Sequence, residues 1–392
     1  MELVEFDPFA DENTQDPFPT YQRLLAEAPA YYNSHHDFWA ITRFEDVKAA
    51  VMDWQTYSSA EGVRIDSLLE LAGPSPLTMD PPRHGLLRNL LRKPFAPRGM
   101  AQLEAVVEQT VSALLDDMAG EEEVEVVSRF AKLLPVAVIC RLLGVPAGEA
   151  TLLKGWADSM LETIPGQVGS TPSALRGAEQ LRDYWLAQLN ERRQSPKDDI
   201  LTIIATAVVE DKPLPIDEQV GMCNLVFEAG NATTGTLIAN SILALGTLSE
   251  QRKWLAANPN AMGDAIEEFL RWESPVQALM RVTKMPVSLH GAEIPAGARV
   301  LLVLGAANRD PRVWESPDEL RLNRPIHRNL AFGDGIHHCI GAPLARLEAP
   351  IALRHFMKRY PAYEVTSITR FHDVSMRTLK ALSIRVEGAS AA

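Results

Sequence analysis

The sequence predicts a mostly helical protein with small β-sheets, organised as one domain over residues 1–392. Apolar residues recur with helical periodicity from about residue 101 to residue 255. Strand-like patterns are short and confined to residues 38–42, 287–290, 300–304 and 381–386. Residues 217–248 run with little polar relief on any side, and a helix of that length would reach about 45 Å, the width of a whole domain.

The elements divide into a β-rich part and a helical part. We expect strands near residues 30–65 and 280–305, completed by residues 363–387, and helices over residues 80–275 and 340–360. Asp217 is suited to cap the first turn of the long helix. Two other helices should each bury one face, because apolar side chains recur there at helical spacing. The residues on these faces are Val106, Thr110, Leu114, Met118, Leu181, Trp185 and Leu189.

Composition narrows the classes of function. Asp and Glu number 51 against 38 Lys and Arg, and the formal net charge of -13 argues against binding of nucleic acid by broad phosphate neutralisation. The 3 cysteines are too few for a disulfide framework and lack the paired spacing of a zinc site. The first residues do not resemble a signal peptide, and no apolar run is long enough to span a bilayer. We therefore expect a cytoplasmic protein without a membrane anchor.

The strongest local signal is the segment FGDGIHHCIG at residues 332–341, which precedes a helical apolar pattern. A cysteine that opens a helix is favoured as thiolate, because the positive end of the helix dipole stabilises negative charge. Gly333, Gly335 and Gly341 would let the backbone turn tightly and bring amide N–H groups close to the sulfur. Cys339 is therefore the candidate metal ligand, and the alternative is a buried, inert thiol.

This segment resembles the haem-ligand loop of cytochromes P450, and further segments similar to that family follow in the expected order along nearly the whole chain. The resemblance implies the P450 fold, a triangular prism built around a long central helix over haem b. It makes Cys339 the iron ligand. The other haem-binding residues that it implies in this loop are Phe332, Gly333, His337 and Gly341.

Two features flank the loop along the chain. Glu268 and Arg271 stand three apart, where they can pair on one side of a helix. They match the family's Glu-x-x-Arg pair, which ties the core to the loop before the ligand; a weak surface pair is the alternative. Pro350 lies inside the helix after the cysteine, where it should remove one backbone hydrogen bond and kink the helix.

A set of basic residues matches the positions that hold the haem propionates in similar proteins. His84 and Arg88 stand four apart, so they project from one face at the start of a helix. With Arg281 and His337 they would supply charge-assisted hydrogen bonds to carboxylates. Without the resemblance, His84 would be interpreted as a core or surface histidine.

Residues 227–234 of the long helix, FEAGNATT, resemble the family's oxygen-binding segment, in which small residues permit a local opening above the iron. Ala229 and Gly230 fit that role. Thr233 matches the hydroxyl that helps to deliver a proton, whereas an isolated Thr would bond back into its own helix. The family usually has Asp or Glu directly before this Thr, and this chain has Ala232.

Glu228 and Asn231 complete the candidate catalytic residues. Glu228 lies four residues before Ala232, on the same helical face. Our hypothesis is that Glu228 lines the pocket and either relays protons or binds a polar or cationic group of the substrate. The alternative is a buried acid satisfied by backbone or water, since an unpaired buried carboxylate is costly.

The resemblance implies a monooxygenase that inserts one atom of O2 into a C–H bond, by hydroxylation or O-dealkylation. Its substrate would be small to medium in size and hydrophobic: a substituted aromatic acid, a terpenoid, a steroid or a polyketide. A peroxide-using enzyme is one alternative, because the acid before Thr233 is missing, and a non-catalytic haem sensor is another. The apolar residues expected to line the pocket are Phe227, Val276, Leu279 and Leu379.

The partners follow from the same resemblance. The chain carries no flavin or iron–sulfur motif, so electrons should come from a separate ferredoxin and its NAD(P)H-dependent reductase. Arg92, Lys93 and Arg346 would supply local positive charge for docking on the Cys339 side. Neither nucleic acid nor a membrane is an expected partner.

Overall fold

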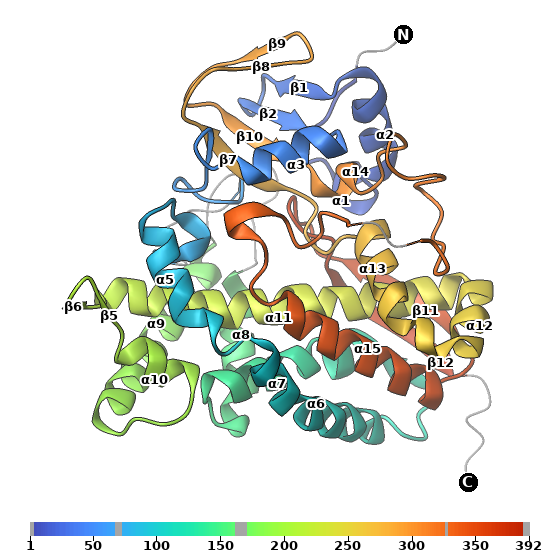
Figure 1. Cartoon of the computed structure of the whole chain (residues 1–392). Coiled ribbons are helices and arrows are strands. Elements are labelled where there is room, and N and C mark those ends of the chain that lie inside the picture. The colour runs from blue at the N-terminus through green and yellow to red at the C-terminus, as the bar shows by residue number, and fades with distance from the viewer. Residues whose placement is uncertain (1–3, 67–72, 161–170, 326–327, 387–392) are drawn as a thin grey trace.

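The computed structural model describes residues 4–66, 73–160, 171–325 and 328–386. A long helix, α11 (Ile216–Thr247), runs through the middle of the molecule (Figure 1). It has 32 residues and confirms the helix predicted over residues 217–248. It packs against α7 (Leu133–Leu143), α9 (Pro172–Gln194) and α15 (Ala342–Arg359), so most of its surface is buried, as a helix without a polar face requires.

The start of α11 differs from the prediction. Pro215 is the N-cap residue, and no side chain caps the helix end. Asp217 lies in the first turn, where its Oδ1 accepts a hydrogen bond from Arg182 Nη2 at 2.8 Å. The expectation that Asp217 caps the helix was therefore wrong, although its charge still interacts favourably with the positive end of the helix dipole.

The strands that the structure describes form small sheets. A five-stranded sheet has the order β1-β2-β10-β7-β3 and lies at the top of Figure 1. Its β2 and β10 are parallel and its other neighbouring strands are antiparallel. A three-stranded sheet has the order β11-β12-β4, and β5-β6 and β8-β9 are two-stranded. The bounds are β1 Ala30–Asn33, β2 Phe38–Ile41, β3 Tyr57–Ser58, β4 Glu123–Glu125, β5 Val208–Val209, β6 Lys212–Pro213, β7 Leu279–Thr283, β8 Val287–Leu289, β9 Ala292–Ile294, β10 Arg299–Leu302, β11 Tyr363–Arg370 and β12 Leu379–Val386.

The predicted mostly helical fold with small β-sheets is confirmed. The four strand-like segments coincide with β2, β8, β10 and β12. Helices dominate the segment between the sheets, with the short β4, β5 and β6 as unpredicted interruptions. The remaining helices are α1 Asp11–Gln15, α2 Phe18–Glu27, α3 Phe44–Met52, α5 Arg83–Arg92, α6 Pro97–Asp117, α8 Ala150–Met160, α10 Ile200–Ala205, α12 Ser249–Ala257, α13 Met262–Trp272 and α14 Leu304–Ala307.

The buried faces of two helices test the predicted core positions. On α9 the three predicted residues Leu181, Trp185 and Leu189 have no exposed surface. On α6 the buried face is displaced by one residue, so three predicted positions are only partly buried and Met118 alone is fully buried. The buried residues of α6 are Met100, Leu103, Val107, Val111 and Leu115. The sequence pattern gives a wide apolar stripe, and the neighbouring helices decide which line within it lies innermost.

The helix α15 follows the cysteine-containing segment and packs against α6 and α11. It has 18 residues and continues through Pro350. A proline lacks the backbone N–H, so one helical hydrogen bond is lost at this position. Pro350 therefore does not end α15.

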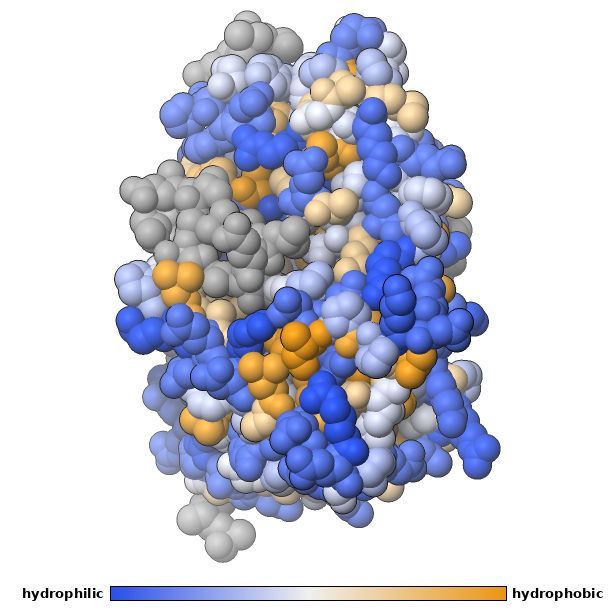
Figure 2. Space-filling view, turned by 90° about the vertical axis from the view of Figure 1, so that its left-hand side faces the viewer, coloured by the Kyte–Doolittle hydropathy of each residue, from blue (hydrophilic) through white to orange (hydrophobic). Residues whose placement is uncertain are grey.

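Figure 2 shows the face at the left of Figure 1, where hydrophobic side chains gather within a mostly hydrophilic surface. Exposed hydrophobic residues on elements at this side include Leu175 of α9, Val208 of β5 and Ile216 of α11. Within the described residues, no helix combines the length and the apolar character that crossing a membrane requires.

Candidate active site

Cys339 lies in a loop between the short 3-10 turn Gly335–His337 and the start of α15. Its backbone N–H donates to the carbonyl of Phe332 at 2.9 Å, which closes the loop. Gly333 and Gly335 have φ of 63° and 64°, in the left-handed region where a side chain is strained. A Cβ on Gly335 would also lie 3.1 Å from the Cα of Met52. The backbone of the loop therefore requires these glycines.

The thiol of Cys339 is accessible, and protein groups surround it closely. The residue is exposed, and a Cβ on Gly341 would lie 3.8 Å from its Sγ. Desolvation by the surrounding protein raises the pKa of the thiol, whereas backbone N–H groups, among them that of Gly341, and the charges of Arg88 and Arg346 lower it. The expected influence of the helix start is thus present, but desolvation is the larger effect.

Three elements bring four basic side chains together beside this loop. His84 and Arg88 come from α5, Arg281 from β7 and His337 from the loop itself. The rings of His84 and His337 lie 4.5 Å apart, and Arg88 Nη2 donates to the carbonyl of His338. We call His84, Arg88, Arg281 and His337 the basic cluster.

The charge of Asp80 acts on His84, Arg281 and His337, but Asp80 is itself paired with Lys284 at 2.6 Å. Within the described ranges, none of its members forms an ion pair with a carboxylate, and His84 Nε2 is buried without a hydrogen-bond partner. Burial and the neighbouring cations lower the pKa of His337 to about 3, and burial lowers the pKa of Arg281 to about 10. Buried cations without compensation favour the binding of an anionic group.

Glu268 and Arg271 form a buried ion pair on α13. Arg271 Nε is 2.7 Å from Glu268 Oε2, and Nη2 donates to Oε1 at 2.8 Å. Arg271 also donates to the carbonyls of Asn308, Pro317 and Glu319. The pair therefore fastens α13 to the chain that leads toward the cysteine loop, and it is not a surface pair.

The middle of α11 carries an accessible face with small residues. Ala229 is exposed and Thr233 partly exposed, although most of the helix is buried. Thr233 Oγ1 donates to the carbonyl of Ala229 at 2.9 Å. The helix is continuous through this segment, so the expected local opening is not present. A Cβ on Gly230 would lie 2.9 Å from Ile139 Cδ1, which means that Gly230 allows the close approach of α7.

Glu228 differs from every other predicted catalytic residue in its surroundings. Its Oε1 is buried and has no hydrogen-bond partner. Burial raises the pKa of the carboxyl to about 7, and the charge of Arg64 acts in the opposite direction. Asn231 is also buried, on the side of α11 that carries Phe227.

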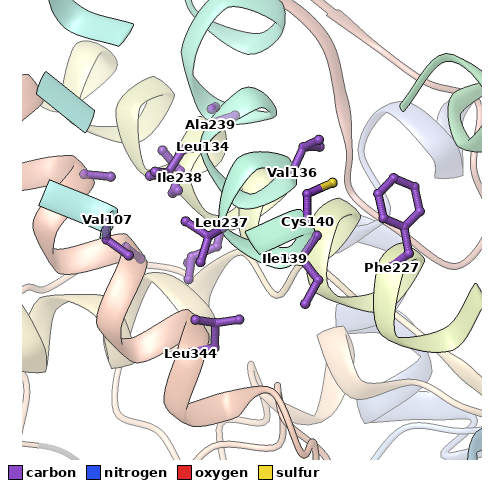
Figure 3. Close-up of a cluster of buried hydrophobic side chains, with 14 of the residues drawn as sticks. Val107, Leu134, Val136, Ile139, Cys140, Phe227, Leu237, Ile238, Ala239 and Leu344 are labelled. Atoms are coloured by element: carbon purple, nitrogen blue, oxygen red, sulfur yellow. The ribbon is translucent and has the colours of Figure 1, made fainter. Parts of the chain in front are cut away.

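The four predicted pocket residues fall into two groups. Val276 and Leu279 are partly accessible. Leu379 is buried at the start of β12. Phe227 has no exposed surface, and its ring lies 5.9 Å from that of Trp185, on the side of α7 that carries Cys140 (Figure 3). The structure therefore places Phe227 and Leu379 in the core, because neighbouring helices and strands cover them.

Arg64 was not predicted from the sequence. It is the charged residue that acts on Glu228, and it pairs with Asp66 and Asp373. Asp373 is separated from Arg64 by 309 residues, so no local pattern indicates the contact. The local sequence shows only that Arg64 stands two residues before Asp66 in a loop near Gly62, and this spacing alone does not predict a functional site.

An accessible cysteine at the start of a helix, beside buried cations that lack an anion, is the arrangement expected of a haem-thiolate protein. The comparisons agree, and the chain belongs to the cytochrome P450 family. The family model described as Cytochrome P450 matches residues 262–380. The chain is 35% identical over 371 residues to Cytochrome P450 109 of Bacillus spizizenii, covering 93% of this chain and 88% of that protein.

Other relatives cover most of the chain as well. Vitamin D(3) 25-hydroxylase of Pseudonocardia autotrophica is 37% identical over 362 residues, covering 89% of this chain and 87% of the relative. The crystal structure of CYP109E1 from Bacillus megaterium in complex with testosterone superposes with a TM-score of 0.89 at 31% identity, covering 96% of this chain and 100% of that chain. The fold and the monooxygenase class predicted from the sequence are confirmed, and proteins of this family bind haem through a thiolate.

Proposed function

We propose that this protein is a haem b-dependent monooxygenase that inserts one atom of O2 into a C–H bond of a hydrophobic substrate, by hydroxylation or O-dealkylation. The observation that carries the proposal is the accessible Cys339 beside the uncompensated basic cluster. Bound haem supplies oxygen activation at its iron. The residues of the chain supply binding, orientation and proton positions.

The haem fits the donors that the chain offers. Cys339 would be the iron ligand, and the backbone N–H of Gly341 would donate a hydrogen bond to its sulfur. His84, Arg88 and Arg281 would hold the propionates, for which the free His84 Nε2 is a ready donor. His337 stays neutral at ordinary pH, because its pKa is about 3, and would act through hydrogen bonds only.

Thr233 is the proposed proton-positioning hydroxyl. Because its Oγ1 already donates to Ala229, its lone pairs are left to accept a hydrogen bond from water. No acid stands beside it at Ala232. This absence favours a second candidate function, oxidation that uses hydrogen peroxide in place of O2 and a reductase. Comparing turnover with peroxide alone and with the reductase chain decides between the two.

The substrate and partners are proposed more broadly. Val276 and Leu279 offer apolar contacts, and relatives include a vitamin D(3) hydroxylase and a testosterone complex, so we propose a steroid-like or other bulky hydrophobic substrate. A separate ferredoxin would dock near Arg92 and Lys93, which are exposed, while Arg346 is already paired with Glu267 at 2.6 Å. We propose a cytoplasmic location from the scattered cysteines.

The test is a reconstituted reaction with ferredoxin, reductase and NADPH. Testosterone and vitamin D3 are first screened for a change in haem spin state, and binders are then incubated under labelled O2. We expect substrate-dependent NADPH consumption and one labelled oxygen atom in the product. Haem binding without product from any spin-shifting ligand would instead favour the haem sensor.

A further inference from the structure

Glu228 is a carboxylate that the protein leaves without a partner. It makes no hydrogen bond within the described ranges, and its Oε1 is buried. A desolvated carboxylate without a donor is costly, so its retention on a partly accessible part of α11 points to a ligand that supplies the donor.

Arg64 does not compensate this charge. Its Nη2 lies 2.7 Å from Asp66 Oδ2 and 3.0 Å from Asp373 Oδ1, and both of those carboxylates are nearly inaccessible to solvent. The charge of Arg64 is thus already balanced by Asp66 and Asp373, and it is not available to pair with Glu228. We call Arg64, Asp66, Asp373 and Glu228 the acidic cluster. Such a local field attracts a cation and disfavours a substrate carboxylate.

The acidic cluster borders the accessible residues of the proposed pocket. The backbone N–H of Met280 donates to the carbonyl of Val63 at 2.8 Å, which places the loop of the cluster against β7. On the other side, Asp373 Oδ1 accepts from the N–H of Met376 at 3.0 Å, and Met376 forms a β-bridge with Val276. The charges and the apolar contacts therefore lie along one wall.

Resting on the proposed monooxygenase function, we propose that Glu228 binds a positively charged group of the substrate, so that the substrate is a hydrophobic molecule with a quaternary or protonated nitrogen. A proton relay through Glu228 fits the geometry less well. Glu228 and Thr233 are five residues apart, about 140° around the helix. The hydroxyl of Thr233 is moreover bonded to Ala229.

The test uses two probes of the same shape, benzyltrimethylammonium and neopentylbenzene, which differ only in charge. The quaternary nitrogen cannot ligate iron, so direct coordination by an amine is avoided. Binding to the haem-loaded protein is measured by the spin-state shift and by calorimetry. We expect the wild type to prefer the cation by roughly tenfold and Glu228→Gln to lose that preference, with neopentylbenzene bound at least as well as before.

Two matched variants complete the experiment. Glu228→Asp keeps the charge and should keep a preference for the cation. Asp217→Asn removes a carboxylate from the same helix at an exposed ion pair and should change neither affinity. Equal affinities for the two probes in the wild type, or an unchanged preference in Glu228→Gln, would overturn the proposal. The carbon monoxide spectrum distinguishes failure of this proposal from failure of the proposed function. A wild type without the absorption band of a thiolate-bound haem would refute the proposed monooxygenase function.

Discussion

Glu268 and Glu228 are glutamates on helices, each with a buried carboxyl oxygen, and their surroundings are opposite. Glu268 accepts hydrogen bonds from the side chains of Arg271 and Arg324 and from the backbone N–H of Arg321. Glu228 accepts none within the described residues. Glu268 is saturated by its own fold and holds structure together, whereas Glu228, on a partly accessible part of α11, is the carboxylate that we propose takes its partner from outside the protein.

Replacing Arg271 tests whether the hydrogen-bonded Glu268 stabilises the fold. Arg271→Ala leaves Glu268 buried without its main cation, and we expect a loss of about 3–5 kcal/mol in the free energy of unfolding. Denaturant unfolding of the haem-loaded protein measures it. Arg321→Ala, a partly exposed residue of the loop that contacts Glu268, should cost only about 0–1 kcal/mol. A loss in Arg271→Ala as small as the one expected for Arg321→Ala would show that the buried pair does not stabilise the fold.

The carboxyl of Glu228, unpaired within the described residues, should make the free energy of unfolding depend on pH. The pKa of Glu228 is raised from 4.5 to about 7 in the folded protein, so the protonated form is favoured there and ionisation costs stability. As pH rises through this window, the wild type should lose up to about 3 kcal/mol relative to Glu228→Gln. Thermal unfolding below and above the window measures the difference. A difference that does not change with pH would mean that Glu228 has a partner.

The basic cluster also lacks a carboxylate partner within the described residues, but its side chains are donors that would bind an anion. Arg281→Leu removes one charge-assisted bond to the proposed propionate, and we expect haem to dissociate roughly tenfold faster. Transfer of haem to apomyoglobin gives the rate. Arg92→Leu, at the exposed end of α5, serves as the control. Equal rates for Arg281→Leu and the wild type would remove Arg281 from the haem site.

A further effect concerns the packing beside Glu228. Gly230→Ala would place a Cβ 2.9 Å from Ile139 Cδ1, and we expect a cost of about 1–3 kcal/mol from overpacking. The new Cβ would also lie 2.9 Å from Ile139 Cγ1, so adding Ile139→Ala, which removes both atoms, should restore part of the loss. If the second substitution gives no recovery, Gly230 is required for a reason other than the approach of α7.

The sequence was sufficient wherever the signal is local. The cysteine loop depends on glycines at fixed spacing, and the structure gives Gly333 and Gly335 the positive φ that explains them. The long helix follows from a run of residues without a polar face. The pairing of Glu268 with Arg271 follows from a spacing of three residues on one helix.

The rest depends on contacts between distant segments. No pattern distinguishes Phe227, covered by Trp185, from the accessible Val276, because both are apolar residues in plausible positions. Burial is decided by which helix packs on which face. The same limit hides the contact between Arg64 and Asp373, which only the folded chain brings together.

The account depends most directly on the bond between the Cys339 sulfur and the haem iron. The purified protein should be reduced and exposed to carbon monoxide, with Cys339→Ser treated in parallel. We predict the long-wavelength Soret band of a thiolate-bound haem in the wild type and its loss in the variant. A wild type without this band, or a variant that keeps it undiminished, would contradict the assignment.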